Sequence, residues 1–344
     1  MTIRFAAGIK EETCSRPLRF LWWNVQDLAH FTPRMQAIER WPKSPDEYAA
    51  KLARVSEVIR SSSEKNGTPE LVALAEVTLE AAADLKRTLF PEHRLLSLDS
   101  VPDNPDFHVA VLFPNDSAFQ EVAPFVAFDV PETTRPMAVL DYVKNGEQIR
   151  FISAHWTAPF NTAGERYQEE LATQLRGYIH DFVHSENTGN SRHVVLMGDF
   201  NAEPFQVLQH HFGATRSRAR ARSRRHYSDK AVRRIRLYNC GWRLLGENLP
   251  HSPDAHARSV AGTAYWQREN TWHTWDQILV SGTLLTSKRP YLSEDSVKVI
   301  ADGILLNEEG LPQKFAWNDG NPIGVSDHLP TIGTIMLDAS PEKK

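Results

Sequence analysis

The sequence predicts one α/β domain of two or more packed layers, and three observations support this fold class. Apolar segments of strand length alternate with amphipathic helical segments along the chain. No internal repeat and no long Gly/Ser linker divides the 344 residues. The composition is 41% hydrophobic and 24% charged, as in an ordinary globular protein, and the chain is long enough to bury a sizeable core.

The individual elements follow from their local patterns. The first strand is expected at residues 18–25, where LRFLWWNV is apolar and aromatic. A helix is expected over residues 44–64, because Ser44 and Pro45 supply a cap and a first-turn proline, and because Tyr48, Leu52, Val55 and Ile59 share one helical face. The other expected strands are 69–77, 108–113, 135–143, 148–156, 193–200, 274–281 and 328–337, and the other expected helices are 80–90 and 165–183.

Charge and cysteine content limit the possible classes of protein. The net charge of −4 provides no global attraction to nucleic acid or membrane. Two cysteines exclude a disulfide framework and fit a reducing compartment. The N-terminal region has no signal-peptide core, and no run approaches the roughly 18 apolar residues of a membrane span. We therefore expect a soluble, cytoplasmic protein without a membrane partner, whose oligomeric state stays open.

Residues 214–236 are expected to form an Arg-rich insertion loop. Residues 215–236 contain nine Arg and one Lys against one Asp, a local charge of +9 that leaves −13 for the rest of the chain. Such a run is usually a solvated loop. Its functional interpretation is contact with a phosphate backbone, made by the arginines at its start: Arg216, Arg218, Arg220, Arg222, Arg224 and Arg225.

Polar side chains end several of the expected strands. The residues concerned are Asn24, Glu76, His155, Asp199, Asn201, Asp276, Asp327 and His328. Buried carboxylates are costly unless they are paired or bind a metal, and ligands of α/β folds collect at one end of the strands. One shared site therefore explains all of them. Its oxygen-rich donor set suits Mg²⁺ or Mn²⁺ in a phosphate-handling arrangement.

The stretch HVVLMGDFN illustrates how a strand can deliver such groups. Gly198 would let the backbone leave the buried strand tightly. Side-chain direction repeats every two residues in an extended chain, so Asp199 and Asn201 would face one way and Phe200 the other. Taken singly, each of these residues also has a structural interpretation, as a turn residue, a surface acid or a packed histidine.

In this order, the motifs resemble those of the endonuclease/exonuclease/phosphatase superfamily over about residues 18–336. This superfamily includes pancreatic-type deoxyribonucleases, abasic-site endonucleases, inositol polyphosphate phosphatases and bacterial sphingomyelinases. WNVQDL, LAEV, SAHWTAP, GDFNAEP and SDHLP look like its successive motifs, and WDQILVS is similar to its Asp-x-Ile-x-Val strand. The resemblance implies a four-layer α/β/β/α sandwich with two mixed sheets and the active site at one end of the sheets. The domain would span residues 18–338, with tails at 1–17 and 339–344.

The resemblance also implies metal-assisted hydrolysis of a phosphate ester by water. Glu76 would bind the metal, helped by Asn24 and Asp327. Asp199 would orient or deprotonate the water, and Asn201 would hold a phosphate oxygen.

By the same resemblance, His328 would contact the scissile phosphate, and Asp276 would fix its tautomer. His155 would contact the phosphate or protonate the leaving oxygen, and the assignment of acid and base between the two histidines stays open. The chain departs from the deoxyribonuclease pattern in the acid that should pair with His155, for which Asp106 is a poor match.

The leading functional hypothesis is a Mg²⁺-dependent nuclease acting on DNA or RNA, favoured by the Arg-rich segment. The alternative is a phosphatase or phosphodiesterase acting on a small molecule, such as a nucleotide, an inositol phosphate or a lipid headgroup. A catalytically inactive nucleic-acid-binding module is a third hypothesis, disfavoured because the whole ligand set is present. Trp272 and Trp275 flank Asp276 and are expected to wall the cleft.

Overall fold

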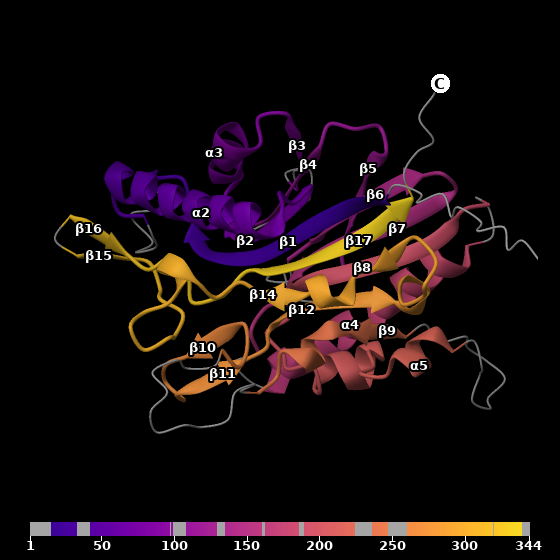
Figure 1. The fold of residues 1–344 in the computed structure, drawn as a ribbon. Coiled ribbons are helices and arrows are strands. Elements are labelled where there is room, and N and C mark those ends of the chain that lie inside the picture. Colours follow the sequence, from indigo (N-terminus) through magenta and orange to yellow (C-terminus); the bar gives the residue numbers. More distant parts are fainter. Residues whose placement is uncertain are drawn as a thin grey trace, which may run out of the picture.

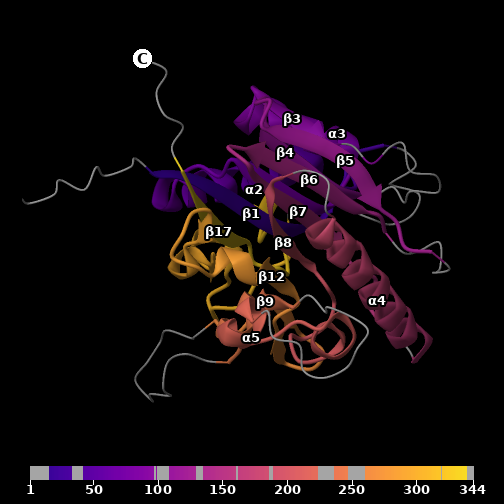
Figure 2. The ribbon, with the colours of Figure 1, turned by 90° about the vertical axis from the view of Figure 1, so that its right-hand side faces the viewer.

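The computed structural model describes residues 15–32, 42–96, 98, 108–128, 135–159, 162–185, 189–223, 236–246, 260–318 and 320–338. Two β-sheets lie face to face at its centre, and helices cover their outer faces (Figures 1 and 2). The predicted α/β/β/α sandwich with two mixed sheets is therefore confirmed.

The first sheet has the strand order β13-β17-β1-β2-β4-β3, and β14 also pairs with β17. β1 runs parallel to β2 and antiparallel to β17, so the sheet is mixed. Its strands are β1 (Ser15–Leu28), β2 (Leu71–Val77), β3 (His93–Leu96), β4 (His108–Pro114), β13 (Tyr291–Leu292), β14 (Lys298–Val299) and β17 (Thr331–Asp338).

The second sheet has the order β5-β6-β7-β8-β12-β9, in which only β7 and β8 are parallel neighbours. Its strands are β5 (Phe119–Phe125), β6 (Met137–Lys144), β7 (Glu147–His155), β8 (Ser191–Asp199), β9 (Leu237–Asn239) and β12 (Asp276–Ser281). Two hairpins stand apart from both sheets: β10 (Ala264–Trp266) with β11 (Thr271–His273), and β15 (Ala316–Asn318) with β16 (Asn321–Ile323).

Three long helices form the outer layers. α2 (Pro45–Asn66) and α3 (Leu79–Leu89) share one apolar core with the first sheet, α4 (Thr162–His184) shares another with the second sheet, and a third core lies between the sheets. Shorter helical segments are η1 (Leu208–Phe212), α5 (Arg218–Arg222), η2 (Cys240–Arg243), η3 (Gly282–Leu284), η4 (Glu294–Ser296) and η5 (Gly303–Leu305). None of the helices in the described ranges is both long and apolar enough to cross a membrane.

β1 shows how the sequence pattern generates these layers. Side chains alternate across a strand, so Phe20 and Trp22 enter the core between the sheets, while Leu21 and Trp23 enter the core beneath α2 and α3. The two adjacent tryptophans therefore reach opposite faces of one sheet.

α2 follows its predicted start but not all of its predicted buried face. The Ser44 side chain accepts a hydrogen bond from the Glu47 amide, and Pro45 opens the helix. Tyr48, Val55 and Ile59 are buried as expected. Leu52 is only partly buried, and Lys51, which the pattern had not selected, is 2% exposed.

All the predicted strands and helices are present, with bounds shifted by a few residues. β1 begins at Ser15, three residues before the expected start of the domain. Strands of two to four residues, such as β9 and β10, were not predicted because they are too short to show alternation. In the Arg-rich segment the structure describes residues up to 223, including α5, and from 236 onwards, so Arg224 and Arg225 lie outside the described residues.

Candidate active site

The predicted site residues converge because the strand ladders bring them to one end of the sandwich. His155 is the last residue of β7 and pairs with Asp199, the last residue of β8. Asp276, the first residue of β12, pairs with Asp199 from the other side. Asn24 lies in β1 of the first sheet, and its side-chain amide donates a hydrogen bond to Asp199 in the second sheet. The two sheets therefore share one polar cluster.

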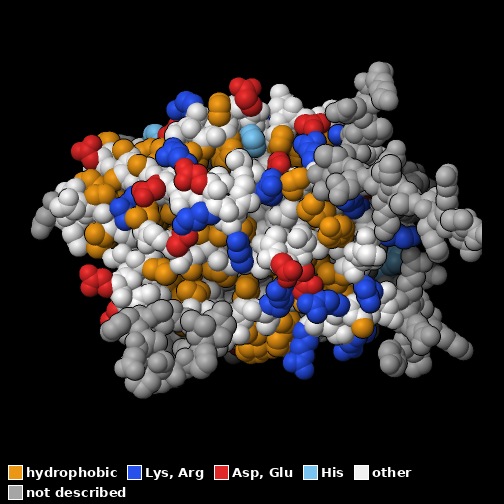
Figure 3. Space-filling view, viewed as in Figure 1, with side chains coloured by type: hydrophobic (Ala, Val, Ile, Leu, Met, Phe, Trp, Pro, Cys, Tyr) orange, Lys and Arg blue, Asp and Glu red, His pale blue; other side chains and the backbone are white. Residues whose placement is uncertain are grey.

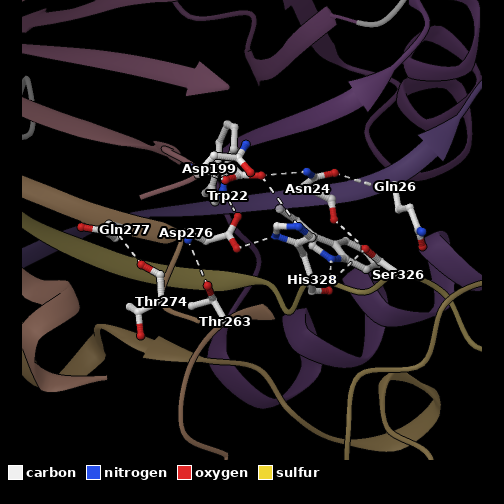
Figure 4. Close-up of polar contacts among 12 residues, drawn as sticks. Trp22, Asn24, Gln26, Asp199, Thr263, Thr274, Asp276, Gln277, Ser326 and His328 are labelled. Atoms are coloured by element: carbon white, nitrogen blue, oxygen red, sulfur yellow. Dashed lines mark hydrogen bonds and ion pairs between the residues drawn. The ribbon is translucent and has the colours of Figure 1, made fainter. Parts of the chain in front are cut away.

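Asp276 holds His328 in place (Figure 4). The Oδ2 atom of Asp276 lies 2.7 Å from Nδ1 of His328, and its Oδ1 accepts a hydrogen bond of 2.8 Å from the indole N–H of Trp22. The backbone N–H of Asp276 donates to the Thr263 hydroxyl. Both carboxylate oxygens of this fully buried residue thus have partners, and Nε2 of His328 is left facing Asp199 at 3.8 Å.

Short contacts also fix the backbone of His328. The Ser326 hydroxyl donates to the Asn24 carbonyl and accepts the His328 amide N–H. The indole N–H of Trp23 donates to the His328 carbonyl at 3.0 Å. The SDH motif is therefore tied directly to the WWN motif, 300 residues earlier in the chain.

The electrostatics of the buried pair favour a protonated His328. Burial acts to lower the pKa of this imidazole, but the negative charges of Asp276 and Asp199 outweigh burial and raise the pKa well above its usual value. Burial raises the pKa of the Asp199 carboxyl, and the positive charge of His328 opposes that rise. A cationic imidazole held by one carboxylate and facing another can donate a hydrogen bond to a phosphoryl oxygen.

Asp199 and Asn201 both belong to the polar cluster, but the backbone that carries them differs from the predicted extended chain. Oδ2 of Asp199 accepts from the Asn24 amide at 3.0 Å, and its Oδ1 accepts from the Asn201 backbone N–H at 2.9 Å. Asn201 is not in extended conformation: its φ is +47°, and its side-chain amide donates to the Trp156 carbonyl. The expectation of an extended chain is therefore wrong here, although Phe200 does point into the core.

Gly198 also serves a purpose that was not predicted. It lies within β8, and a Cβ atom at this position would overlap the Ala154 carbonyl of the neighbouring strand β7. Glycine is therefore required by the close approach of the two strands rather than by a turn.

Glu76 and Asn24 form a second, more open corner of the site. The Asn24 amide bridges Oε1 of Glu76 at 3.2 Å and Asp199, while Oε2 of Glu76 accepts the Asp27 backbone N–H. The Glu76 side chain is 26% exposed, so its carboxylate is accessible from outside. Its φ of +57° is a left-handed conformation that non-glycine residues adopt at a cost, as is common at functional sites.

Asp327 lies at this corner too, but its carboxylate is already paired. Its Oδ2 atom is 2.9 Å from the Lys314 ammonium. The buried Lys51 ammonium interacts with the carboxylates of Asp327, Glu76 and Asp27; burial nevertheless lowers the Lys51 pKa to about 8. These oxygen donors suit a hard divalent cation.

A tighter group, Asp199, Asp276 and His328, also brings three potential metal-binding atoms within 4.8 Å of one another. Hydrogen bonds already engage both oxygens of Asp276 and Nδ1 of His328. The corner at Glu76 is therefore the better fit for a cation, and the tighter group is better explained as a hydrogen-bonded Asp276–His328 pair that faces Asp199.

His155 connects the two corners. Its Nε2 lies 3.6 Å from Oε1 of Glu76 and 3.8 Å from Oδ2 of Asp199. Burial, together with the positive charge of Arg135, lowers the pKa of His155 to about 3, despite the attraction of Asp199. The imidazole is therefore neutral at physiological pH. The expected acidic partner Asp106 lies outside the described residues.

Arg135 is a site residue that the sequence analysis missed. Its Nη1 lies 3.5 Å from Nε2 of His155. The available signal was its position at the start of the expected strand 135–143, at the same edge as the other polar residues, but a single Arg before a proline carries no motif. A guanidinium at this place can bind a phosphate oxygen.

Aromatic side chains border the site on the β10–β11 side. The Trp275 ring centroid lies 6.0 Å from that of His328, and Trp275 stacks on His273 at 4.3 Å. Trp266, which is 38% exposed, packs edge-on against Trp275. The expectation that Trp275 walls the cleft fits this geometry, whereas Trp272 packs against Tyr265 in the hairpin.

The short helix α5, with Arg218, Arg220 and Arg222, lies at the other end of the sandwich. Thr215 and Leu237 are hydrogen-bonded, so the segment is anchored beside the Ser281 end of β12. That end is about 17 Å from Asp276, at ~3.4 Å per residue. Arg218 forms a two-pronged ion pair with Glu294, and Arg216 lies over the Trp242 ring. Figure 3 shows basic side chains gathered in this region with acidic ones between them.

Comparison with known proteins bears on these findings. Residues 21–328 match the model of the Endonuclease/Exonuclease/phosphatase family. No curated protein matches the chain by sequence.

The solved structures that are similar in fold include the following three. An endonuclease/exonuclease/phosphatase family protein from Bacteroides thetaiotaomicron has a TM-score of 0.54 at 14% identity, covering 96% of this chain and 99% of that one. A mannosyl-6-phosphatase of the same species has 0.54 at 13%, covering 92% and 99%. Truncated Caenorhabditis elegans TDP2 has 0.52 at 12%, covering 93% and 97%. At such identities the likeness shows the fold alone.

Proposed function

Since the chain belongs to the endonuclease/exonuclease/phosphatase family, whose members are metal-dependent phosphoesterases, we propose that it is a Mg²⁺- or Mn²⁺-dependent nuclease that hydrolyses phosphodiester bonds of DNA or RNA. One observation carries the chemical part of this proposal. A protonated His328, held by Asp276, faces the carboxylate of Asp199 beside the open carboxylate of Glu76.

The chain supplies oxygen ligands for the cation. Glu76 is its main ligand in this proposal, with Asn24 and Asp327 beside it. When bound, the cation polarises the phosphoryl group and offsets its negative charge. Asp327 would exchange its ion pair with Lys314 for the metal.

The side chains of the site then divide the proton transfers. Asp199 accepts a proton from the water that attacks phosphorus, because burial raises its basicity. His328 is the cationic group: it stabilises the phosphoryl charge and donates a proton to the oxygen whose bond to phosphorus breaks. Asp276 keeps the His328 proton on Nδ1 and directs Nε2 toward the reaction.

The remaining polar residues bind phosphate oxygens. His155 is neutral, so it contributes a hydrogen bond rather than an acidic proton. Arg135 contributes positive charge beside it. Asn201 uses one amide N–H on the Trp156 carbonyl and keeps the second for a phosphate oxygen.

The Arg-rich segment supports a polynucleotide substrate. Its charge of +9 suits contact with successive phosphates. Because α5, with Arg218, Arg220 and Arg222, lies far from Asp276, contacts of these arginines would be made to substrate lying well outside the catalytic cluster. Arg216, which lies over the Trp242 ring, belongs to the same proposed substrate-binding set. We extend the proposal to Arg224 and Arg225 by continuity of the sequence.

A second candidate function is hydrolysis of a small phosphate ester. The aromatic border of Trp275 and Trp266 supports it, because such rings pack against the planar or sugar portion of a small molecule. The third hypothesis, an inactive binding module, is disfavoured by the intact Asp276–His328 pair that faces Asp199.

Turnover on a panel of substrates tests the proposal. The panel is single-stranded DNA, double-stranded DNA, RNA and a small chromogenic phosphodiester, each with Mg²⁺ or Mn²⁺, and His328→Ala controls for contaminating enzymes. Cleavage of a polynucleotide that is lost in the variant supports a nuclease. Cleavage of the small ester alone would replace it with the second candidate, and no cleavage at all would refute both.

A further inference from the structure

Lys51 is a charged side chain in the protein interior, where it requires compensating interactions. It lies on the inner face of α2 and is 2% exposed. Removing an ammonium from water costs several kcal/mol unless other groups compensate. The charged groups that interact with it all lie outside α2.

The compensating groups belong to the open corner of the candidate site. The Lys51 ammonium donates a hydrogen bond to the Gln26 carbonyl and interacts with the carboxylates of Asp27, Glu76 and Asp327. The Phe315 ring lies beside the ammonium, with its centroid 5.4 Å from Nζ. The Gln26 carbonyl and the three carboxylates therefore either shape the corner or carry its negative charge.

The backbone at this corner is held in an unfavourable conformation. Gln26, Asp27 and Glu76 have φ values of 50°, 51° and 57°. For residues other than glycine the left-handed conformation is unfavourable. Three contacts hold the turn: the Gln26 N–H donates to the Asn24 side-chain oxygen, the Asp27 N–H donates to Glu76, and Lys51 donates to the carbonyl of Gln26. Lys51 is the only one of these groups that comes from a different layer of the fold.

The charges at the corner limit how many cations it can accept. Three carboxylates contribute −3 and Lys51 contributes +1, which leaves −2; Lys314 is not counted, because the metal would replace it on Asp327. One divalent cation brings the corner to zero. Two divalent cations would bring it to +2 in a partly buried environment, where unbalanced charge is costly.

We propose that Lys51 is a positioning residue that holds the Gln26–Asp27 turn against Glu76 and takes the place of a second cation, so that this corner binds a single divalent metal ion. The inference rests on the proposed metal site. It assigns Lys51 no contact with substrate.

Metal binding measured without substrate tests this inference. Mn²⁺ binding would be followed by titration calorimetry and by the EPR signal of free Mn²⁺, for the wild type, Lys51→Met, Lys51→Arg and Lys65→Met. Lys65 is the matched control, because it lies on the same helix in a solvent-exposed ion pair with Asp302. Thermal melts would verify that each variant is folded.

The expected stoichiometry is one Mn²⁺ per chain in the wild type, in Lys51→Arg and in Lys65→Met. In Lys51→Met the stoichiometry should rise to two, because a methionine keeps the side-chain length but removes the internal cation. Two Mn²⁺ in the wild type would overturn the inference even if Lys51→Met did not fold. A folded Lys51→Met that binds one Mn²⁺ with unchanged affinity would also overturn it.

These outcomes are separate from those of the proposed function. A protein that shows the expected change in stoichiometry but cleaves no phosphodiester would refute the function and leave the role of Lys51 intact. If the wild type cleaves phosphodiesters but binds two Mn²⁺, the role of Lys51 is refuted and the proposed function is left intact.

Discussion

Trp22 and Asp276 belong to different sheets and are joined by a hydrogen bond of 2.8 Å between the indole N–H and Oδ1. The bond crosses the core between the sheets and ends on the carboxylate that orients His328. The packing of the sandwich and the chemistry of the site therefore depend on the same contact. Since Asp276 is fully buried, loss of one donor cannot be made good by water.

Trp22→Phe should lower stability and shift the pH dependence of activity. The unsatisfied Oδ1 costs about 1–3 kcal/mol beyond the loss of ring volume. A carboxylate with one donor fewer attracts His328 more strongly, so the pKa of His328 should rise further and the alkaline limb of the rate profile should move to higher pH. Urea unfolding and the pH profile of kcat measure the two effects.

Trp156→Phe is the matched control for this variant. Trp156 is also a buried indole, but its Nε1 has no hydrogen-bond partner among the described residues. The Trp156→Phe variant should lose only the stability that comes from the volume of the ring. The alkaline limb of its pH profile of kcat should not move. Equal losses and unchanged profiles in both variants would show that the bond from Trp22 to Asp276 is unimportant.

Asp276→Asn should move the alkaline limb in the opposite direction. Without the negative charge of Asp276, burial dominates and the pKa of His328 falls. We expect kcat to decrease by about 10²–10⁴-fold, the usual contribution of a positioned acid or base. Imidazole NMR titration of His328 measures the pKa directly, and a His328 pKa that stays raised in this variant would contradict the assignment.

The contact between Asp276 and His328 also makes the free energy of unfolding depend on pH. The folded-state pKa of His328 is raised above its unfolded value of about 6.5, so the contribution of His328 to stability is complete below that pH. The contribution is lost as the pH rises through the folded-state pKa. Urea unfolding of the wild type should show this decline on the alkaline side, and the slope should be reduced in Asp276→Asn.

The strand-end residues were predictable because strand ladders and the order of motifs bring them together whatever the details of packing. Contacts between sheets were not predictable. Trp22 and Trp23 look like equivalent core residues in sequence, yet one reaches a carboxylate and the other a backbone carbonyl. Lys51 looks like a surface residue because helical periodicity registers only apolar side chains. The left-handed conformation of Asn201 left no sequence signal, since Asn is common in turns of every type.

Gly198→Ala should destabilise the protein. The new Cβ would overlap the Ala154 carbonyl, so β7 and β8 would have to separate. We expect a loss of about 2 kcal/mol or more, as for other core overpacking changes. Gly177→Ala in α4 is the control: nothing lies within 4 Å of its added Cβ, and it should gain about 1 kcal/mol of stability. A Gly198→Ala protein as stable as the wild type would refute the close-approach explanation.

Neutralising exposed arginines should weaken binding only to long substrates. Arg220 and Arg222 are exposed, and α5 lies at the end of β12 remote from Asp276. In the double variant Arg220→Ala/Arg222→Ala, the slope of log K against log salt should decrease by about 0.9 per lost double-stranded DNA contact.

Turnover of a small phosphodiester should be unaffected by the same double variant. The double variant Arg87→Ala/Arg166→Ala, which removes two exposed arginines outside the segment, is the charge-matched control. An unchanged salt slope would reduce the Arg-rich segment to a solvated loop.

The most direct test of the proposed mechanism is phosphodiester turnover as a function of metal, in protein stripped with a chelator, for the wild type and Asp199→Asn. Both proteins should be folded by circular dichroism. The account predicts no turnover of the stripped wild type, restoration by Mg²⁺ or Mn²⁺, and no restoration in Asp199→Asn. Turnover that persists without metal, or an Asp199→Asn protein as active as the wild type, would contradict it.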